Sequence, residues 1–171
     1  AKSINTHIDD KPVFELIDLT LTREQMIIKR FFDILVSAIG IIITSPLMPI
    51  IALLIKATSP GPVLYTQERV GLYGKTFKLY KFRTMIDGAE KFTGPVFATE
   101  NDSRITSVGR FLRSTRLDEL PQLLNVLKGE MSIVGPRPER PFFVKQFNNE
   151  NPHYKYRHIV KPGITGLAQV M

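Results

Sequence analysis

The chain has 171 residues, of which 43% are hydrophobic and 23% charged, so it can build a core and global disorder is not expected. The absence of cysteine excludes a disulfide framework, a thiol nucleophile and a cysteine-ligated zinc site, and the three histidines (His7, His153 and His158) form no metal-ligand pair at helical spacing. The net charge of +7 is uneven, because residues 1–28 carry three basic and five acidic residues whereas residues 29–171 carry 20 basic and 11 acidic ones.

The first segment, residues 1–25, mixes acidic residues with isolated apolar ones. This pattern indicates a linker or an amphipathic lead-in. We therefore place the first boundary of the chain near residue 26.

An uncharged, almost wholly apolar run of 22 residues follows, from Ile34 to Ile55. As a straight helix it would span roughly 33 Å, enough to cross a bilayer core. Pro46 and Pro49 interrupt it near its middle, and Ser45 precedes a proline, a position that disfavours the helical region. Each half is then too short to span alone. We therefore expect residues 26–57 to form a membrane helix broken at Ser45-Pro46.

The charges beside the run indicate its topology. Lys29 and Arg30 precede it and Lys56 follows it, and basic residues favour the cytoplasmic side. Basic residues at both ends predict a re-entrant helix that enters one leaflet, turns and returns. A kinked but complete span and a buried helix of a soluble protein are the alternatives.

The polar remainder, residues 58–171, is expected to form one small domain. Turn signals at residues 58–62 and 71–74 flank a predicted strand at 63–67, and a return strand follows at 76–83, which together predict a short β-hairpin. Residues 87–103 have no clear period and are expected to be mostly loop.

The rest of this domain is mainly helical by pattern. One helix is predicted from about Ser107, and a second from about Asp118, with Pro121 in its first turn and a stop at Lys128-Gly129. The segments after it are predicted to be an ordered loop or extended piece at 134–141, a helix interrupted near Pro152 at 142–158, and a glycine-rich loop at 161–166. The fold class is therefore α/β and mostly helical, with amphipathic helices beside the hairpin.

One acidic pair, Asp118-Glu119, stands in this basic domain, just after a stretch (residues 104–116) with four arginines and no acid. We expect an aspartate among arginines and at a helix start to keep a low pKa and stay ionised. That state suits a carboxylate nucleophile or a Mg²⁺ ligand. Ordinary capping of a helix by first-turn acids is the alternative interpretation.

Several basic residues are candidate phosphate ligands. Arginine offers a planar fork that matches phosphate oxygens, whereas lysine acts as a point charge. Arg137 is presented between two prolines, which fix its backbone. The candidates are Arg69, Lys81, Arg83, Arg113, Arg116 and Arg137. A solvated basic face or a contact with anionic lipid is the alternative.

Residues 78–83 interleave basic and aromatic side chains, a pattern that can bind single-stranded nucleic acid. No recognised nucleic-acid motif accompanies it. We therefore expect no nucleic-acid partner.

Six ordered blocks resemble the catalytic domain of bacterial monotopic phosphoglycosyl transferases, the undecaprenyl-phosphate sugar phosphotransferases. The resemblance covers about residues 27 to 171. The blocks are Lys29-Arg30-Phe31-Phe32-Asp33, Ser45-Pro46, Tyr80-Lys81-Phe82-Arg83-Thr84-Met85, Leu117-Asp118-Glu119-Leu120-Pro121-Gln122-Leu123, Met131 to Pro138, and Lys161 to Val170.

The resemblance implies a reaction and its residues. A sugar 1-phosphate passes from a UDP-sugar to a polyprenol phosphate and UMP leaves, as the first membrane step of exopolysaccharide or other glycan synthesis. Asp118 would be the nucleophile, forming an aspartyl-phosphosugar intermediate, and Glu119, with Asp118 beside it, would hold Mg²⁺. Lys81, Arg113 and Arg137 match phosphate-binding positions of the family, and Ser45-Pro46 matches its re-entrant break.

The same resemblance implies a place and partners. The domain would work on the cytoplasmic face of the bacterial inner membrane, alone, as a homo-oligomer, or with other enzymes of glycan assembly. Members of the family continue past the Gly-Leu-Ala-Gln-Val segment, so we expect residues 58–171 to lack a C-terminal tail. A non-catalytic membrane scaffold is therefore the alternative function.

Overall fold

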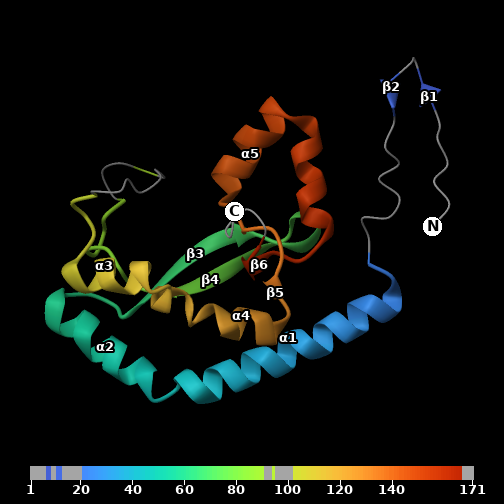
Figure 1. Ribbon diagram of the computed structural model, residues 1–171. Coiled ribbons are helices and arrows are strands. Elements are labelled where there is room, and N and C mark those ends of the chain that lie inside the picture. Colours follow the sequence, from blue (N-terminus) through green and yellow to red (C-terminus); the bar gives the residue numbers. More distant parts are fainter. Residues whose placement is uncertain (1–6, 9–10, 13–20, 91–93, 95–101, 167–171) are drawn as a thin grey trace.

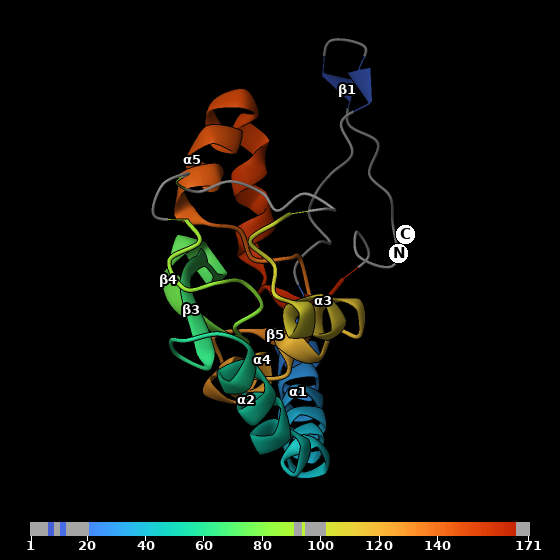
Figure 2. The same cartoon turned by 90° about the vertical axis from the view of Figure 1, so that its left-hand side faces the viewer.

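The computed structural model describes residues 7–8, 11–12, 21–90, 94 and 102–166. Its elements lie in layers (Figures 1 and 2). Helices α1 and α2 form one end of the molecule, α3 and α4 lie on them, the β3–β4 hairpin comes next, and α5 lies at the opposite end. In the expected lead-in, β1 (His7–Ile8) pairs antiparallel with β2 (Lys11–Pro12).

The apolar run folds as two helices, α1 (Arg23–Thr44) and α2 (Leu47–Thr58), which meet at an angle of 62°. α1 begins slightly before the expected residue 26, because Thr22 and Gln25 form a capping box there. At the bend, the Thr44 hydroxyl donates to the Gly40 carbonyl (2.7 Å) and the Ser45 hydroxyl to the Ile42 carbonyl (2.9 Å). The predicted break at Ser45-Pro46 is confirmed. Pro46 has no N–H to donate to the Ile42 carbonyl, and the Ser45 hydroxyl donates to that carbonyl instead.

Neither helix has the length and hydropathy to cross a bilayer by itself within the described part of the chain, whereas the bent pair α1–α2 passes that test as a unit. Its outer surface is apolar and exposed. The exposed large apolar side chains of the pair include Met26, Ile27, Ile28, Phe31, Phe32, Ile34, Leu35, Val36, Ile39, Ile42, Ile43, Ile50, Leu53 and Leu54. A continuous apolar face of this size marks a surface that contacts lipid or protein.

The predicted hairpin is present as β3 (Leu64–Val70) and β4 (Thr76–Phe82), paired antiparallel with Tyr65 opposite Lys81. A short 3-10 turn, η2 (Leu72–Gly74), joins them. The hairpin supplies Phe82 to one core cluster, with α2 and α3, and Leu79 to another, with α4. It therefore joins the layer of α1 and α2 to the rest of the domain.

The first predicted helix is α3 (Ser107–Ser114), whose N-terminus is capped by the Thr106 hydroxyl. The second was predicted from Asp118, but α4 spans Gln122–Lys128, and a separate 3-10 turn, η3 (Leu117–Glu119), precedes it. Pro121 has no backbone N–H to donate to Leu117, which explains why no regular α-helix runs through this point. The stop at Gly129, with φ of 85°, is as predicted.

The last part of the chain contains a pairing that the sequence patterns missed. β5 (Ser132–Val134) and β6 (Gly163–Thr165) form a parallel two-stranded sheet. β6 lies in the expected glycine-rich loop, and β5 ends where the expected loop or extended piece begins. Between them lie α5 (Pro141–Glu150) and the 3-10 helix η4 (Pro152–Ile159), which confirms the predicted interruption near Pro152. At Gly163, a side-chain Cβ would lie only 2.1 Å from the Gly135 nitrogen, so this close approach requires glycine.

Polar residues of α1 attach it to the domain. Arg30 donates to the Val126 carbonyl (2.6 Å) and the Leu127 carbonyl (2.8 Å), at the C-terminus of α4. Asp33 is buried, where it accepts hydrogen bonds from Ser132 and the backbone of β5.

Lys29 completes this attachment by pairing with Asp33 at 3.5 Å and donating to the Ser132 hydroxyl. Lys29 and Arg30, predicted from charge to set membrane topology, thus also bind α1 to α4 and β5.

Candidate active site

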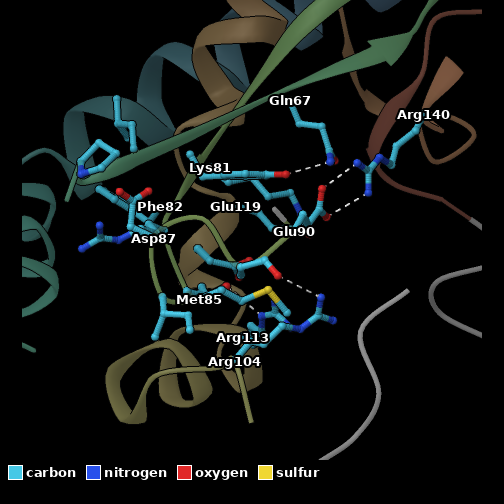
Figure 3. Close-up of a pocket in the computed structure, with 18 of the residues that line it drawn as sticks. Gln67, Lys81, Phe82, Met85, Asp87, Glu90, Arg104, Arg113, Glu119 and Arg140 are labelled. Atoms are coloured by element: carbon cyan, nitrogen blue, oxygen red, sulfur yellow. Dashed lines mark hydrogen bonds and ion pairs between the residues drawn. The ribbon is translucent and has the colours of Figure 1, made fainter. Parts of the chain in front are cut away.

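A cavity of about 670 Å³ opens between the hairpin, the loop at residues 84–90, the end of α3, η3 and the segment before α5 (Figure 3). Its walls bring together every residue that the sequence predicted as catalytic or phosphate-binding. These are Arg69, Lys81, Arg83, Arg113, Arg116, Asp118, Glu119 and Arg137. The four topology residues, Lys29, Arg30, Ser45 and Pro46, lie outside it, on and beside α1.

The acids lie on η3, a turn that begins at an unusual backbone position. Arg116 has φ of 60° and ψ of 12°, the left-handed conformation that residues other than glycine adopt rarely. This residue lies between α3 and η3. Asp118 and Glu119 are both buried, and both line the cavity.

Burial raises the pKa of Asp118, an effect that the Lys81 and Arg113 charges oppose and the neighbouring Glu119 charge reinforces. The expectation of a low pKa for Asp118 was therefore wrong. The arginines of the sequence do surround this carboxylate, but the loss of hydration outweighs their attraction.

Glu119 behaves in the opposite way. Burial favours its neutral form, but Lys81, which donates to Oε1 at 2.8 Å, and Arg137, whose Nη2 lies 3.6 Å from Oε1, together lower the pKa of Glu119. Burial lowers the pKa of Lys81 as well, and Glu119 opposes that shift. The two adjacent carboxylates therefore differ in their protonation: the pKa of Asp118 is shifted toward the neutral form, whereas Glu119 is kept as an anion by its ion pair with Lys81.

Arg113 comes from the last turn of α3, and its Nε donates to the Thr84 hydroxyl at 2.8 Å. α3 itself packs tightly on this strand end, since a Cβ at Gly109 would lie 1.9 Å from the Thr84 carbonyl oxygen. Thr84 stands in one of the six blocks, but no sequence pattern predicted that it orients Arg113.

Two predicted phosphate ligands are instead engaged with the protein. The Arg83 guanidinium is buried and donates to the carbonyls of Pro60 (2.7 Å) and Ser59 (2.8 Å), so it holds the turn after α2. Arg69 donates to the Pro138 carbonyl (2.9 Å) and to Gln67 (2.5 Å). These contacts favour structural roles for both arginines.

Another set of cavity residues was not predicted. Glu90 and Arg140 form a two-point ion pair at 2.7 and 2.9 Å, and Gln67 donates to the Tyr65 hydroxyl at 2.8 Å (Figure 3). All four line the cavity. They add a neutralised ion pair and uncharged hydrogen-bonding groups to a wall that also holds the basic residues and the acids Asp118 and Glu119.

The acidic pair suits a magnesium ion on chemical grounds. Mg²⁺ in phosphate-transfer sites is bound by one or two carboxylates together with substrate phosphates. Within the described residues, no group of three or more histidine or acidic side chains forms a closed metal cage. Asp118 and Glu119 fit the open arrangement, and a cation beside Asp118 would offset the effect of its burial.

Several side chains of the basic-aromatic strand make contacts within the protein. Leu79 and Phe82 are buried, Lys81 pairs with Glu119, and Arg83 holds the turn after α2. The Lys128 ammonium lies over the Tyr80 ring at 4.5 Å. The absence of a nucleic-acid partner stays a prediction.

Comparison with known proteins gives one consistent family. Residues 24–171 match the family model described as bacterial sugar transferase. The chain is 54% identical over 144 residues to the UDP-N-acetylgalactosamine-undecaprenyl-phosphate N-acetylgalactosaminephosphotransferase of Aeromonas hydrophila, covering 84% of this chain and 34% of the relative. It is 47% identical over 171 residues to the UDP-glucose:undecaprenyl-phosphate glucose-1-phosphate transferase of Klebsiella pneumoniae, covering 99% of this chain and 36% of the relative.

A third relative has a different sugar in its name. The undecaprenyl-phosphate galactose phosphotransferase of Salmonella typhimurium is 44% identical over 163 residues, covering 86% of this chain and 33% of the relative. The chain thus spans about a third of the length of these curated relatives.

Proposed function

The chain belongs to the bacterial sugar transferase family, and from this premise we propose that it transfers a sugar 1-phosphate from a UDP-sugar to undecaprenyl phosphate and releases UMP. One observation carries the proposal. Two adjacent buried carboxylates, Asp118 and Glu119, face a cavity whose wall also holds Lys81, Arg113 and Arg137. A nucleophile amid cations is the arrangement that attack on a diphosphate requires.

In the proposed first step, an Asp118 carboxylate oxygen attacks the sugar-proximal phosphorus. The bond from that phosphorus to the bridging oxygen breaks, and the electron pair leaves with UMP. The sugar phosphate is then held on Asp118 as a mixed anhydride. In the second step, a phosphate oxygen of the lipid attacks the same phosphorus, the bond to Asp118 breaks, and the carboxylate returns to its starting state.

The cations have separate roles in this scheme. Arg113, fixed by Thr84, and Arg137, beside Glu119, bind phosphate oxygens through their planar forks. Lys81 keeps Glu119 ionised and adds a point charge next to the reacting centre. Together they offset the repulsion between the Asp118 carboxylate and the anionic diphosphate.

Glu119 and Asp118 are the residues that would hold Mg²⁺. The bound ion would supply neutralisation of phosphate charge in the transition state. The anionic state of Glu119 is compatible with this role, since metal ligands bind in their deprotonated form.

We further propose that α1 and α2 enter one leaflet of the bacterial inner membrane from its cytoplasmic face. The 62° bend, the continuous apolar surface and the basic residues near both ends support this re-entrant topology. A relative in Rhizobium leguminosarum, 45% identical over 148 residues, is an exopolysaccharide production protein, which supports a first membrane step of exopolysaccharide or other glycan synthesis.

The test is UMP release by the chain in detergent or lipid discs, with undecaprenyl phosphate and Mg²⁺. UDP-N-acetylgalactosamine, UDP-glucose and UDP-galactose come first, because the relatives differ in these sugars. We expect UMP with at least one donor, and Asp118→Asn to reduce its rate at least about a thousandfold. Glu68→Gln, which changes an exposed acid on β3 outside the cavity, is the control.

A chain that releases no UMP with any UDP-sugar contradicts the proposal. The non-catalytic scaffold would then remain, and it predicts membrane and partner binding that Asp118→Asn leaves unchanged. Equal rates for wild type and Asp118→Asn would contradict the assigned nucleophile.

A further inference from the structure

The segment that carries Arg137 is held at each backbone carbonyl by a different donor. The Pro136 carbonyl accepts from the Gly163 N–H of β6 (3.0 Å), and the Arg137 carbonyl accepts from the Arg157 guanidinium of η4 (2.7 Å). The carbonyls of Pro138 and Glu139 accept from β3, through the Arg69 side chain and the Val70 N–H, each at 2.9 Å.

These bonds determine where the Arg137 side chain points. The prolines on either side fix their own φ angles, but the peptide planes next to Arg137 still rotate about ψ. A hydrogen bond to a carbonyl fixes its peptide plane. The Arg137 side chain is 41% exposed, and its Nη2 lies 3.6 Å from Glu119 Oε1. Among the described contacts, its direction therefore depends largely on the conformation of the Arg137 backbone.

Arg157 is itself held in place before it reaches Arg137. Its guanidinium lies over the Tyr154 ring, 4.7 Å from the centroid, and donates to the Tyr154 hydroxyl. The Tyr154 ring packs on Phe147 with centroids 5.0 Å apart, and Phe147 stacks on Phe143, which lines the cavity. An aromatic row therefore runs from the cavity wall to Arg157, formed by side chains of α5 and η4. The ribbon of these two elements is orange to red in Figure 1.

We propose that Arg157 is a positioning residue, which holds the Arg137 backbone so that the Arg137 guanidinium faces Glu119 and the donor phosphates. This inference rests on the proposed function of the same cavity. Arg157 does not line the cavity. Its effect on the reaction therefore passes through Arg137.

The experiment is a double-mutant cycle on the full chain, comparing Arg157→Met, Arg137→Met and the double variant. Steady-state UMP release gives kcat and KM, and calorimetry gives the Kd for UDP. We expect Arg137→Met to lower kcat/KM on the order of a hundredfold and Arg157→Met on the order of tenfold. The double variant should match Arg137→Met, because Arg157 has nothing left to position.

The changes in kcat and KM distinguish a positioning role of Arg157 from a general effect on the stability of the protein. Arg157→Met should divide its loss between kcat and KM as Arg137→Met does, and Arg157→Lys, which keeps one donor, should recover part of it. Lys155→Met, an exposed charge removal on the same helix, is the matched control and should leave both constants unchanged. Tyr154→Phe keeps the ring but removes the hydroxyl, and should give a smaller loss of the same kind. If Arg157→Met does not fold, Arg157→Lys and Tyr154→Phe take its place in the cycle with Arg137→Met.

Losses that multiply in the double variant overturn the inference, as does an Arg157→Met protein with wild-type constants. The proposed function fails separately, when wild type releases no UMP with any donor. In that case the Kd values for UDP still test the inference. If Arg137→Met and the double variant bind UDP with the same Kd, Arg157 acts as a positioning residue. If the double variant loses the sum of the two single-variant binding free energies, or if wild type does not bind UDP, the inference is contradicted.

Discussion

At the scale of single residues, the cavity gives two adjacent carboxylates opposite properties. Glu119 is bound by Lys81 and approached by Arg137, which keeps it anionic. Asp118 has no described ion pair of its own and is buried, so its proton is held more tightly than in water. Glu119, which stays charged, is suited to binding a cation. Asp118, whose anion is destabilised by burial, is the more reactive nucleophile.

This difference predicts opposite effects of neutralising each acid. The pKa of Asp118 is raised from 3.8, so the folded state binds its proton more tightly than the unfolded state. Stability therefore falls as the pH rises from 3.8 through the raised pKa, and the penalty persists at neutral pH. Thermal unfolding of Asp118→Asn at neutral pH should show a higher Tm than wild type, with the difference vanishing below about pH 4.

Glu119→Gln provides the contrast. The pKa of Glu119 is lowered from 4.5, so its charge contributes stability that is present above 4.5 and lost as the pH falls through the folded pKa. The variant should have a lower Tm than wild type at neutral pH. Shifts of the same sign for both variants would contradict the two assigned pKa directions.

The residues that meet in the cavity were predictable from the sequence, whereas their protonation states and hydrogen-bond partners were less so. Asp118, Glu119, Lys81 and Arg137 belong to the ordered blocks, Arg113 comes from the arginine-rich stretch just before them, and all five line one cavity. Burial depends on the packing of distant elements, however, so the pKa direction of Asp118 could not be read from neighbouring arginines. For the same reason, nothing local indicated that Arg83 donates to Ser59 and Pro60.

At the scale of elements, the prolines of the apolar run made its break predictable. A proline acts on the residues next to it, and the Ser45 hydroxyl donates to the Ile42 carbonyl that Pro46 leaves without a backbone donor. The β5–β6 pairing could not be foreseen in this way. Each strand has only three residues, and about thirty residues separate them, so no local pattern marks the pair.

The bent pair predicts a labelling result. The chain has no cysteine, so single cysteines at Arg23 and at Lys56 report on the two ends of α1–α2 without background. A membrane-impermeant maleimide should label both positions from the cytoplasmic side, in inverted vesicles, and neither in right-side-out vesicles. Ser45→Cys, at the bend, should stay unlabelled in both. Labelling of Lys56→Cys from the opposite side only would identify a kinked but complete span.

At the scale of the whole molecule, α1 is part of the catalytic domain as well as its apolar base. Arg30 binds the end of α4, and Asp33 binds β5. Gly40 packs against Leu123 of α4 so closely that a Cβ would lie 3.1 Å from the leucine methyl group. β5 leads directly into the Pro136–Glu139 segment. The contacts of α1 therefore reach the support of Arg137.

Removing the Asp33 charge tests this attachment. Asp33→Asn keeps the shape of the side chain but removes the ion pair with Lys29 and disturbs the hydrogen bonds from Ser132 and Ile133. We expect a loss of about 2 kcal/mol in the free energy of unfolding, measured by denaturation in detergent. Glu24→Gln, an exposed change on the same helix, should cause no such loss. Equal stability of Asp33→Asn and wild type would show that packing alone attaches α1.

The close attachment of α1 has a consequence for the reaction as a process on a surface. In the proposed re-entrant topology, an enzyme joined rigidly to α1 could not adjust the height of Asp118, its proposed nucleophile, independently of that helix. The tilt of α1 would then fix the depth at which Asp118 meets the phosphate of an acceptor that diffuses in two dimensions. Helix tilt responds to bilayer thickness. The proposal therefore predicts that the turnover rate depends on the acyl-chain length of the surrounding lipids.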